Sequence, residues 1–179
     1  MVAIMREILR KYPKCEFGRE LFPGNLIPIL RVSGGKTTAD VADWGYLTQK
    51  GKRVYNARSE TLLEKPLFRK DFVQNRCVIP VTGFCEWDGD GTGWDFLPQE
   101  EEMLYLAGVC RKKAEGWEAT VVTEHAAGCV GEIHHRTPLI LSGENLRQWL
   151  YDEAQARQFL EEAKERVLLK RKKMEGETL

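Results

Sequence analysis

The sequence has no excess of charge of either sign, because 27 lysines and arginines are balanced by 27 aspartates and glutamates. Without a global field that attracts nucleic acid, a polyanionic partner has to be held by a local basic patch with a small footprint. Long apolar runs are also missing. None approaches the length that spans a bilayer, and residues 1–9 lack the apolar core of a signal peptide. We therefore expect a cytoplasmic protein with no membrane partner.

Cysteine is sparse and shows no close pairing. The five cysteines are an odd number, and none of them stands in a C-x-x-C motif. This pattern argues against a disulfide framework and against a zinc site, and it favours reduced thiols. We expect no metal and no other cofactor.

The chain has 179 residues, of which 42% are apolar, so it is long enough for one core and short for two. We expect a single domain over residues 1–179 and a monomer. Short β-rich runs between turn residues predict an α+β, sheet-dominated fold with helices at the two ends. The expected strands cover residues 26–32, 41–47, 77–81, 84–87, 103–110, 118–123 and 138–141. The internal Pro28 favours an edge or bulged strand at 26–32 over a central one, and the strands at 103–110 and 118–123 are expected to form a hairpin.

Helical patterns are expected in three places. Residues 2–11 carry apolar side chains at helical spacing before Pro13, and residues 61–72 form a short helix interrupted at Pro66. From residue 145 to about 173 the chain is expected to be helical, in two pieces broken near Asp152 and with a basic helical tail from about 164. Phosphate contact by this tail is one interpretation, and a solvated helix end is the alternative.

Three short stretches carry the polar side chains typical of a site beside strand-like runs: residues 56–60 (NARSE), 83–87 (GFCEW) and 133–138 (IHHRTP). We expect their polar groups to converge at sheet ends. In the second stretch, Glu86 lies in an apolar strand, where a carboxylate is costly to bury unless it is paired or used. Beside Trp87 its pKa can rise enough for proton transfer near neutral pH, whereas the alternative is an ordinary glutamate that faces solvent.

The other polar residues each have a functional and a structural interpretation. His134 and His135 are neighbours, so in an extended segment only one of them enters a shared pocket. Asn56 has an amide suited to a sugar hydroxyl or carbonyl, but it also suits a turn. Arg58 and Arg136 are suited to phosphate oxygens or, alternatively, to surface ion pairs with neighbours such as Glu60.

Trp44 and Trp87 are the aromatic residues beside these stretches. The default for a tryptophan in a strand is a place in the core. Combined with arginines, however, exposed rings are typical platforms for unstacked bases in proteins that bind single strands without much sequence preference. It is the joint occurrence of these signals that favours a nucleic-acid site.

The three stretches resemble the blocks of the SRAP family, SOS-response-associated peptidase-like proteins that recognise abasic sites in single-stranded DNA. Members carry N-A-R-x-E-T, R-C-[IV]-I-P-x-x-G-[FY]-[YF]-E-W and H-x-R-x-P. This chain has NARSET at 56–61, RCVIPVTGFCEW at 76–87 and HHRTP at 134–138. The resemblance covers most of the chain to about residue 150, and three blocks in this order are highly specific. Further matches are Pro23-Gly24, Trp44-Gly45 and Thr123.

The resemblance implies a role for each matching residue. Asn56 would orient the open-chain sugar, Glu86 would be the general acid and base for ring opening, and His134 would be its proton partner. The residues implied in DNA binding are Arg58 and Arg136 at flanking phosphates, Trp44 and Trp87 as a wall against the splayed strand, and Thr123 and Pro23 beside them.

Two departures from the family pattern matter. Members begin Met-Cys-Gly-Arg, and after methionine removal the exposed cysteine traps the ring-opened aldehyde as a thiazolidine through its amine and thiol. The printed sequence begins Met-Val-Ala-Ile instead, so we expect no thiazolidine from a polypeptide that starts there. In addition, Glu20 replaces a common asparagine, and its carboxylate could repel phosphate.

The resemblance leaves three hypotheses. The favoured one is an SRAP-type protein of the DNA damage response whose true start lies upstream. In full-length form it would crosslink covalently to abasic sites, and its peptidase activity would be limited to its own initiator methionine. The second is a non-enzymatic, non-covalent single-stranded DNA-binding module. The third, a small hydrolase with Cys85 and His134, is disfavoured because Cys85 should point away from a pocket that Glu86 enters.

Overall fold

The computed structural model describes residues 2–12, 20–99, 102–161 and 168–172. Its strands are β1 (Leu26–Ser33), β2 (Lys36–Trp44), β3 (Tyr46–Leu47), β4 (Arg53–Val54), β5 (Asn56–Arg58), β6 (Arg76–Val81), β7 (Phe84–Trp87), β8 (Gly93–Pro98), β9 (Leu104–Lys112), β10 (Trp117–His125), β11 (Arg136–Pro138), β12 (Ile140–Leu141) and β13 (Leu168–Lys172). The helices are α1 (Val2–Lys11), a 3-10 turn η1 (Ser59–Thr61), α2 (Pro66–Gln74), α3 (Gly128–Gly131), α4 (Asn145–Tyr151) and α5 (Glu153–Glu161).

The main sheet has the order β11-β10-β2-β1-β6-β9-β12, and β5 joins it by pairing with β10. Strands β9 and β10 also pair with each other, so β10, β2, β1, β6 and β9 form a closed circuit. In β1, Pro28 lacks an amide hydrogen, and the strand pairs with β6 only beyond it, at Leu30 and Arg31. The proline lies in the half of the strand that has no partner on the β6 side, but β1 is an inner strand between β2 and β6, so the expected edge position is wrong.

Two hydrophobic clusters lie on opposite faces of this circuit. The first cluster packs α2, α4 and α5 against the strands through buried residues such as Phe72, Trp149 and Phe159. The second contains small or branched side chains such as Cys77, Ala119 and Val121, with Trp44 and Phe84 partly buried against it. Because strand side chains alternate in direction, neighbouring residues of β10 fall into different clusters.

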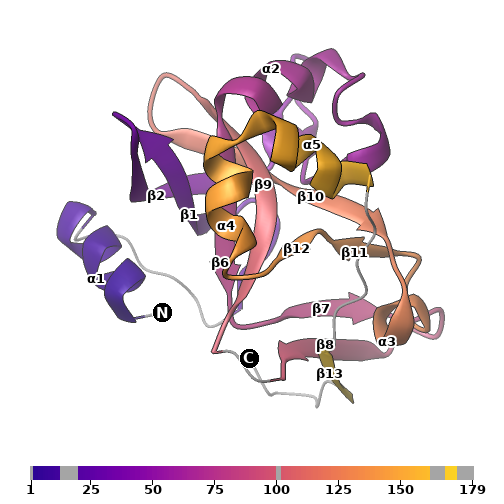
Figure 1. Cartoon of the computed structure of the whole chain (residues 1–179). Coiled ribbons are helices and arrows are strands. Elements are labelled where there is room, and N and C mark those ends of the chain that lie inside the picture. The colour runs from indigo at the N-terminus through magenta and orange to yellow at the C-terminus, as the bar shows by residue number, and fades with distance from the viewer. Residues whose placement is uncertain (1, 13–19, 100–101, 162–167, 173–179) are drawn as a thin grey trace.

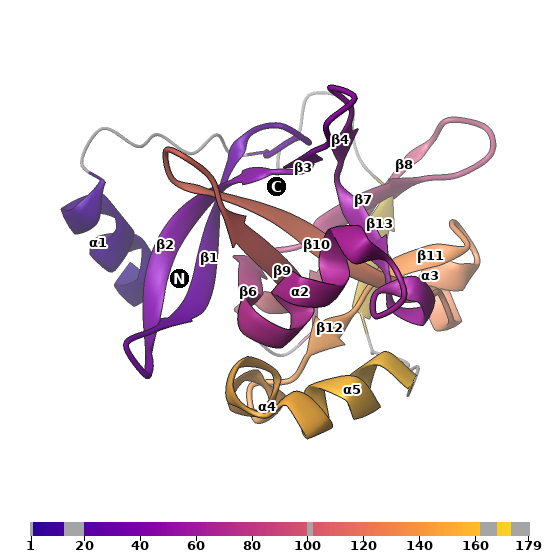
Figure 2. The ribbon, with the colours of Figure 1, turned by 90° about the horizontal axis from the view of Figure 1, so that it is seen from above.

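A second sheet of three strands, in the order β13-β8-β7, lies beside the second cluster (Figures 1 and 2). Phe84 on β7 stacks on Phe96 of β8 with ring centroids 5.2 Å apart. At the other side of the molecule, α1 packs on β2, where Lys11 lies 3.0 Å from the buried carboxylate of Asp40. No helix in the described ranges has the length and apolar character needed to cross a membrane.

The expected α+β, sheet-dominated class is confirmed, and so are the hairpin of β9 and β10 and the break between α4 and α5 at Asp152. The prediction of a helical C-terminal tail is wrong. Residues 168–172 form β13, an edge strand that pairs with β8 from Leu168↔Pro98 to Lys172↔Trp94, while residues 162–167 and 173 lie outside the described ranges.

Two further boundaries differ from expectation. The expected strand at 41–47 is divided at Gly45, where the chain turns between β2 and β3. In place of the expected helix at 61–72, the chain forms a 3-10 turn followed by α2. Pro66 is the first residue of α2, a position that proline favours, so it starts this helix and does not interrupt one.

Candidate functional site

Strand β10 brings the first and third of the polar stretches together. Parallel to it runs β5, with Asn56 opposite Val121 and Arg58 opposite Thr123. Antiparallel to it runs β11, with Arg136 opposite His125. The two stretches are about eighty residues apart in the sequence, yet they end on either side of the same strand. Arg58 and Arg136 thus flank the C-terminal part of β10, whereas Asn56 lies opposite the middle of that strand.

The second stretch reaches the same place from the smaller sheet. Glu86 on β7 directs its carboxylate toward the segment before β11, where its Oε2 lies 3.6 Å from Nδ1 of His134. The side chain of Glu86 is 26% exposed and that of His134 is 34% exposed. His134 is therefore the histidine that contacts the acid, while its neighbour His135 is exposed.

The ring of His134 is held by the backbone two residues further on. Its Nδ1 lies 3.0 Å from the carbonyl oxygen of Arg136 and 3.2 Å from the backbone nitrogen of the same residue. The ring of His135 lies against it, with centroids 4.5 Å apart. Since Glu86 and the Arg136 backbone all approach Nδ1, the proton on this nitrogen is governed by the folded structure.

Burial raises the pKa of Glu86, and the nearby His134 partly opposes this rise. A carboxyl group in this condition is more readily protonated near neutral pH than a solvated one, which is the property of a general acid. The environment that the sequence predicted for Glu86 is thus the one in which the side chain lies.

The same shift predicts how a Glu86→Gln variant responds to pH. The folded state binds the carboxyl proton more tightly than the unfolded state, so ionisation of Glu86 destabilises the fold above the unfolded pKa of about 4.3. We expect Glu86→Gln to melt at a higher temperature than the unmodified protein at pH 7, and this difference to shrink as the pH is lowered to about 4. Thermal melts across that range measure it, and an equal or lower melting temperature at pH 7 would contradict it.

The guanidinium of Arg136 forms hydrogen bonds with other residues of the protein. It is only 9% exposed, and its guanidinium donates to both carboxylate oxygens of Glu60 at 2.6 and 3.1 Å. The same group donates to the carbonyl and hydroxyl oxygens of Thr123 at 2.5 and 3.3 Å. The hydrogen bond from Arg136 lowers the pKa of Glu60. Of the two sequence interpretations of Arg136, the ion pair with Glu60 is the one that the structure contains.

The other predicted DNA-binding residues differ in exposure. Asn56 and Arg58 are both exposed and, two apart in β5, they lie on the same face of the strand, opposite the buried Ala57. Thr123 is buried against Arg136. The remaining members are Trp87, which is 48% exposed, Trp44, which is partly buried, and Pro23, which is exposed.

A hydrogen bond from Trp44 links the end of β2 to the residue that precedes β5. Its indole nitrogen donates to the carbonyl oxygen of Tyr55 at 3.2 Å, immediately before Asn56. At the next position, Gly45 has a φ of +112°, and an added Cβ would lie 2.6 Å from the ring of Tyr55. Glycine is required here both by the backbone conformation and by the close approach of that ring.

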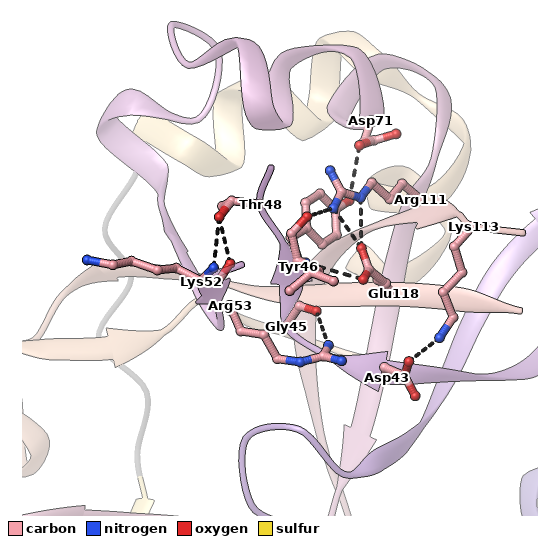
Figure 3. A network of polar contacts seen from close by, with 11 residues as sticks. Asp43, Gly45, Tyr46, Thr48, Lys52, Arg53, Asp71, Arg111, Lys113 and Glu118 are labelled. Carbon is pink, nitrogen blue, oxygen red and sulfur yellow. Dashed lines mark hydrogen bonds and ion pairs between the residues drawn. The ribbon is translucent and has the colours of Figure 1, made fainter. Parts of the chain in front are cut away.

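An ion pair between the partly buried Arg111 and the buried Glu118 supports strand β3 (Figure 3). Arg111 lies 2.8 Å from Glu118, which is 4% exposed and also accepts from the amide of Leu47 at 3.2 Å. Arg111 in turn donates to the carbonyl of Leu47 at 2.5 Å and covers the ring of Tyr46. Sequence reasoning missed this pair. The available signal was the opposite charge of two residues that face each other across the expected hairpin.

Cys85 lies on the other face of β7 from Glu86. In the register with β8, Cys85 is opposite Asp95, whereas Glu86 is opposite Trp94. His134 lies on the side of Glu86, so the geometry does not favour a cysteine–histidine nucleophile. Among the described residues, no group of three or more histidine, cysteine, aspartate or glutamate side chains is arranged to hold a metal ion.

The family model described as SOS response associated peptidase (SRAP) matches residues 9–175. The chain belongs to this family. Among its relatives are the Abasic site processing protein YoqW of Bacillus subtilis, 33% identical over 119 residues, and the Abasic site processing protein HMCES of Gallus gallus, 33% identical over 124 residues. These matches cover 62% and 53% of this chain, and 53% and 37% of the two relatives. The chain thus aligns with about half, or less, of the length of these curated relatives.

Two solved structures share the fold. A protein from Bacteroides thetaiotaomicron superposes with a TM-score of 0.73 at 22% identity, covering 89% of this chain and 82% of the other. A phage-related protein from Bordetella bronchiseptica superposes with a TM-score of 0.74 at 19% identity, covering 94% and 88% of the two chains. At this level of identity, the comparison supports the architecture alone.

Proposed function

We propose that this protein recognises abasic sites in single-stranded DNA and that Glu86 and His134 move the protons that open the sugar of the lesion. The observation that carries the proposal is the 3.6 Å contact between these two side chains. It joins the second and third family blocks next to β11, which pairs with β10, the strand along which β5 and Asn56 also run. The names of the relatives, which are abasic site processing proteins, support the same substrate.

The chemistry suits the groups that are present. The sugar of an abasic site is mainly a closed hemiacetal, and opening it requires a proton at the ring oxygen and removal of the proton from the hydroxyl on C1′. Glu86, whose pKa is raised by burial, supplies the first proton, and His134 accepts the second. Asn56, exposed on β5, would offer its amide to the oxygen of the aldehyde.

The DNA strand itself would be held by exposed groups around this pair. Arg58 presents a guanidinium on the same face of β5 as Asn56 and is the arginine available for a flanking phosphate. Trp87 follows Glu86 and exposes 48% of its surface, enough to stack on an unpaired base. Arg136 contributes through the position of His134 and not through a phosphate.

The covalent step would follow from an amine and a thiol on one cysteine at the N-terminus of a full-length form. The amine adds to the aldehyde carbon and water leaves, which gives an imine. The thiol then adds across the C=N bond to close a thiazolidine, so that one water is released and no oxidant is consumed. Removal of an initiator methionine to expose such a cysteine is the only peptide hydrolysis that this function requires.

The test supplies the amine and the thiol from solution. A polypeptide that begins at Met1 is mixed with an abasic single-stranded oligonucleotide and free L-cysteine, and thiazolidine formation on the DNA is followed by mass spectrometry. We expect the protein to accelerate this reaction by about 10²-fold through general acid and base catalysis, with no heat-stable protein adduct. Absence of acceleration, despite binding, would overturn the catalytic part of the proposal.

A non-covalent single-stranded DNA-binding module is the second candidate, and the exposure of Trp87 and Arg58 favours it. It predicts salt-sensitive binding with equal affinity for abasic and intact strands, and no effect on the reaction with free cysteine. The proposed function instead predicts preferential binding of the abasic strand. Fluorescence anisotropy with the two oligonucleotides at several salt concentrations distinguishes the candidates.

A further inference from the structure

We infer that Glu60 is a positioning residue that fixes the orientation and the tautomer of His134 through Arg136. The inference rests on the proposed function for its effect on the reaction, but its structural content stands separately. It also gives Arg136 a different role from direct phosphate contact. Glu60 comes from the first family block, and Arg136 and His134 come from the third.

The side chain of Arg136 is fixed by Glu60 and Thr123. Glu60 accepts two hydrogen bonds from it in a forked arrangement, and Thr123 adds two more acceptors on β10. A bidentate pair of guanidinium and carboxylate fixes direction as well as distance. Arg136 is 9% exposed, so solvent has little access to the guanidinium, whereas the side chain of Glu60 is 38% exposed. The guanidinium end of Arg136 is therefore fixed in position.

The backbone of the same residue contacts the ring of His134. The amide nitrogen of Arg136 is 3.2 Å from Nδ1 of His134 and its carbonyl oxygen is 3.0 Å from it. An unprotonated Nδ1 accepts from the amide, whereas a protonated Nδ1 donates to the carbonyl or toward Glu86 at 3.6 Å. A displacement of Arg136 alters all of these geometries together, so the side-chain anchor controls where the imidazole proton resides.

A simpler interpretation of the same ion pair is that Glu60 only masks Arg136, which would bind phosphate once released. The two interpretations predict opposite results for Glu60→Gln. Positioning predicts slower chemistry with unchanged affinity for the abasic strand, whereas masking predicts tighter binding. Glu60 also lies 3.2 Å from Nε2 of His125, but that ring is 76% exposed and has a weaker hold on the carboxylate.

The experiment compares Glu60→Gln with Glu64→Gln, which makes the same change of charge at an exposed position four residues away. The side-chain nitrogens of His134 are assigned by ¹⁵N NMR, with His134→Gln as the reference for assignment. In the unmodified protein and in Glu64→Gln we expect one tautomer of the neutral ring. In Glu60→Gln we expect a mixture of tautomers and at least a tenfold slower reaction of the abasic strand with free cysteine, at unchanged Kd.

An unchanged tautomer in Glu60→Gln, or tighter binding with an unchanged rate, would overturn the inference. The NMR result is independent of activity, so it remains decisive if the protein proves not to accelerate the reaction at all. Should Glu60→Gln fold poorly, Thr123→Val removes only the 3.3 Å contact of the hydroxyl with Arg136. In that variant we expect a smaller change of tautomer in the same direction, and no change there would also count against the inference.

Discussion

Replacing Glu86 with glutamine is expected to remove most of the roughly 10²-fold acceleration of abasic-sugar capture, while the affinity for the abasic strand changes little. Glutamine keeps the size and the hydrogen-bonding capacity of the side chain but cannot release a proton. Since burial raises the pKa of Glu86 beside His134, the unmodified side chain holds a proton more readily than a solvated carboxylate does and can donate it to the sugar. Single-turnover rates with saturating protein measure the effect separately from binding.

The matched control for this variant is Glu115→Gln, which removes one carboxylate from the exposed turn between β9 and β10. It is expected to react at the rate of the unmodified protein. If Glu86→Gln retains the full rate, Glu86 is not the proton donor, and the contact with His134 serves structure alone. A rate loss shared by both variants would point to a general effect of charge on DNA binding.

The second large effect is expected at Gly45, where alanine should destabilise the fold by about 3 kcal/mol. The backbone angle φ of +112° disfavours any side chain, and the added Cβ would lie 2.6 Å from one ring atom of Tyr55 and 2.9 Å from another. Since Tyr55 precedes Asn56 and accepts from the Trp44 indole, we expect weaker binding of the abasic strand as well. Urea unfolding measures the loss of stability.

Gly51 provides the control for the backbone contribution. Its φ is +75°, and nothing lies within 4 Å of an added Cβ. We expect Gly51→Ala to cost about 1 kcal/mol, which is the strain of a left-handed conformation without a clash. The difference between the two variants contains the contact with Tyr55 and the extra backbone strain at the larger φ of Gly45, and equal losses would show that this contact is unimportant.

The sequence predicted the components of the site better than their connections. Glu86 stood out because a carboxylate between Cys85 and Trp87 conflicts with an apolar strand, and that conflict is visible in a linear pattern. The partner of Arg136 was not decided by the sequence, because Glu60 and a phosphate satisfy a guanidinium equally well. Only the placement of η1 beside β11 resolves that choice.

The edge strand β13 could not be predicted for a related reason. Its residues are mostly basic and lack the alternation of apolar and polar side chains that indicates a strand. It is instead held by partners distant in sequence, such as Asp95 for Arg171 and Glu132 for Lys170. The break at Gly45 was likewise hidden, since the need for glycine arises from a ring ten residues further along the chain.

Strand β10 has a neighbour on each side over most of its length, with β9 and then β11 along one side and β2 and then β5 along the other. Such a strand cannot bend without losing hydrogen bonds on both sides, so the groups attached around it form a stiff template. Under the proposed function, the DNA and not the protein changes conformation on binding. A nucleotide that has lost its base gives up the least stacking when it swings outward, so rigidity by itself would favour the damaged position over its intact neighbours.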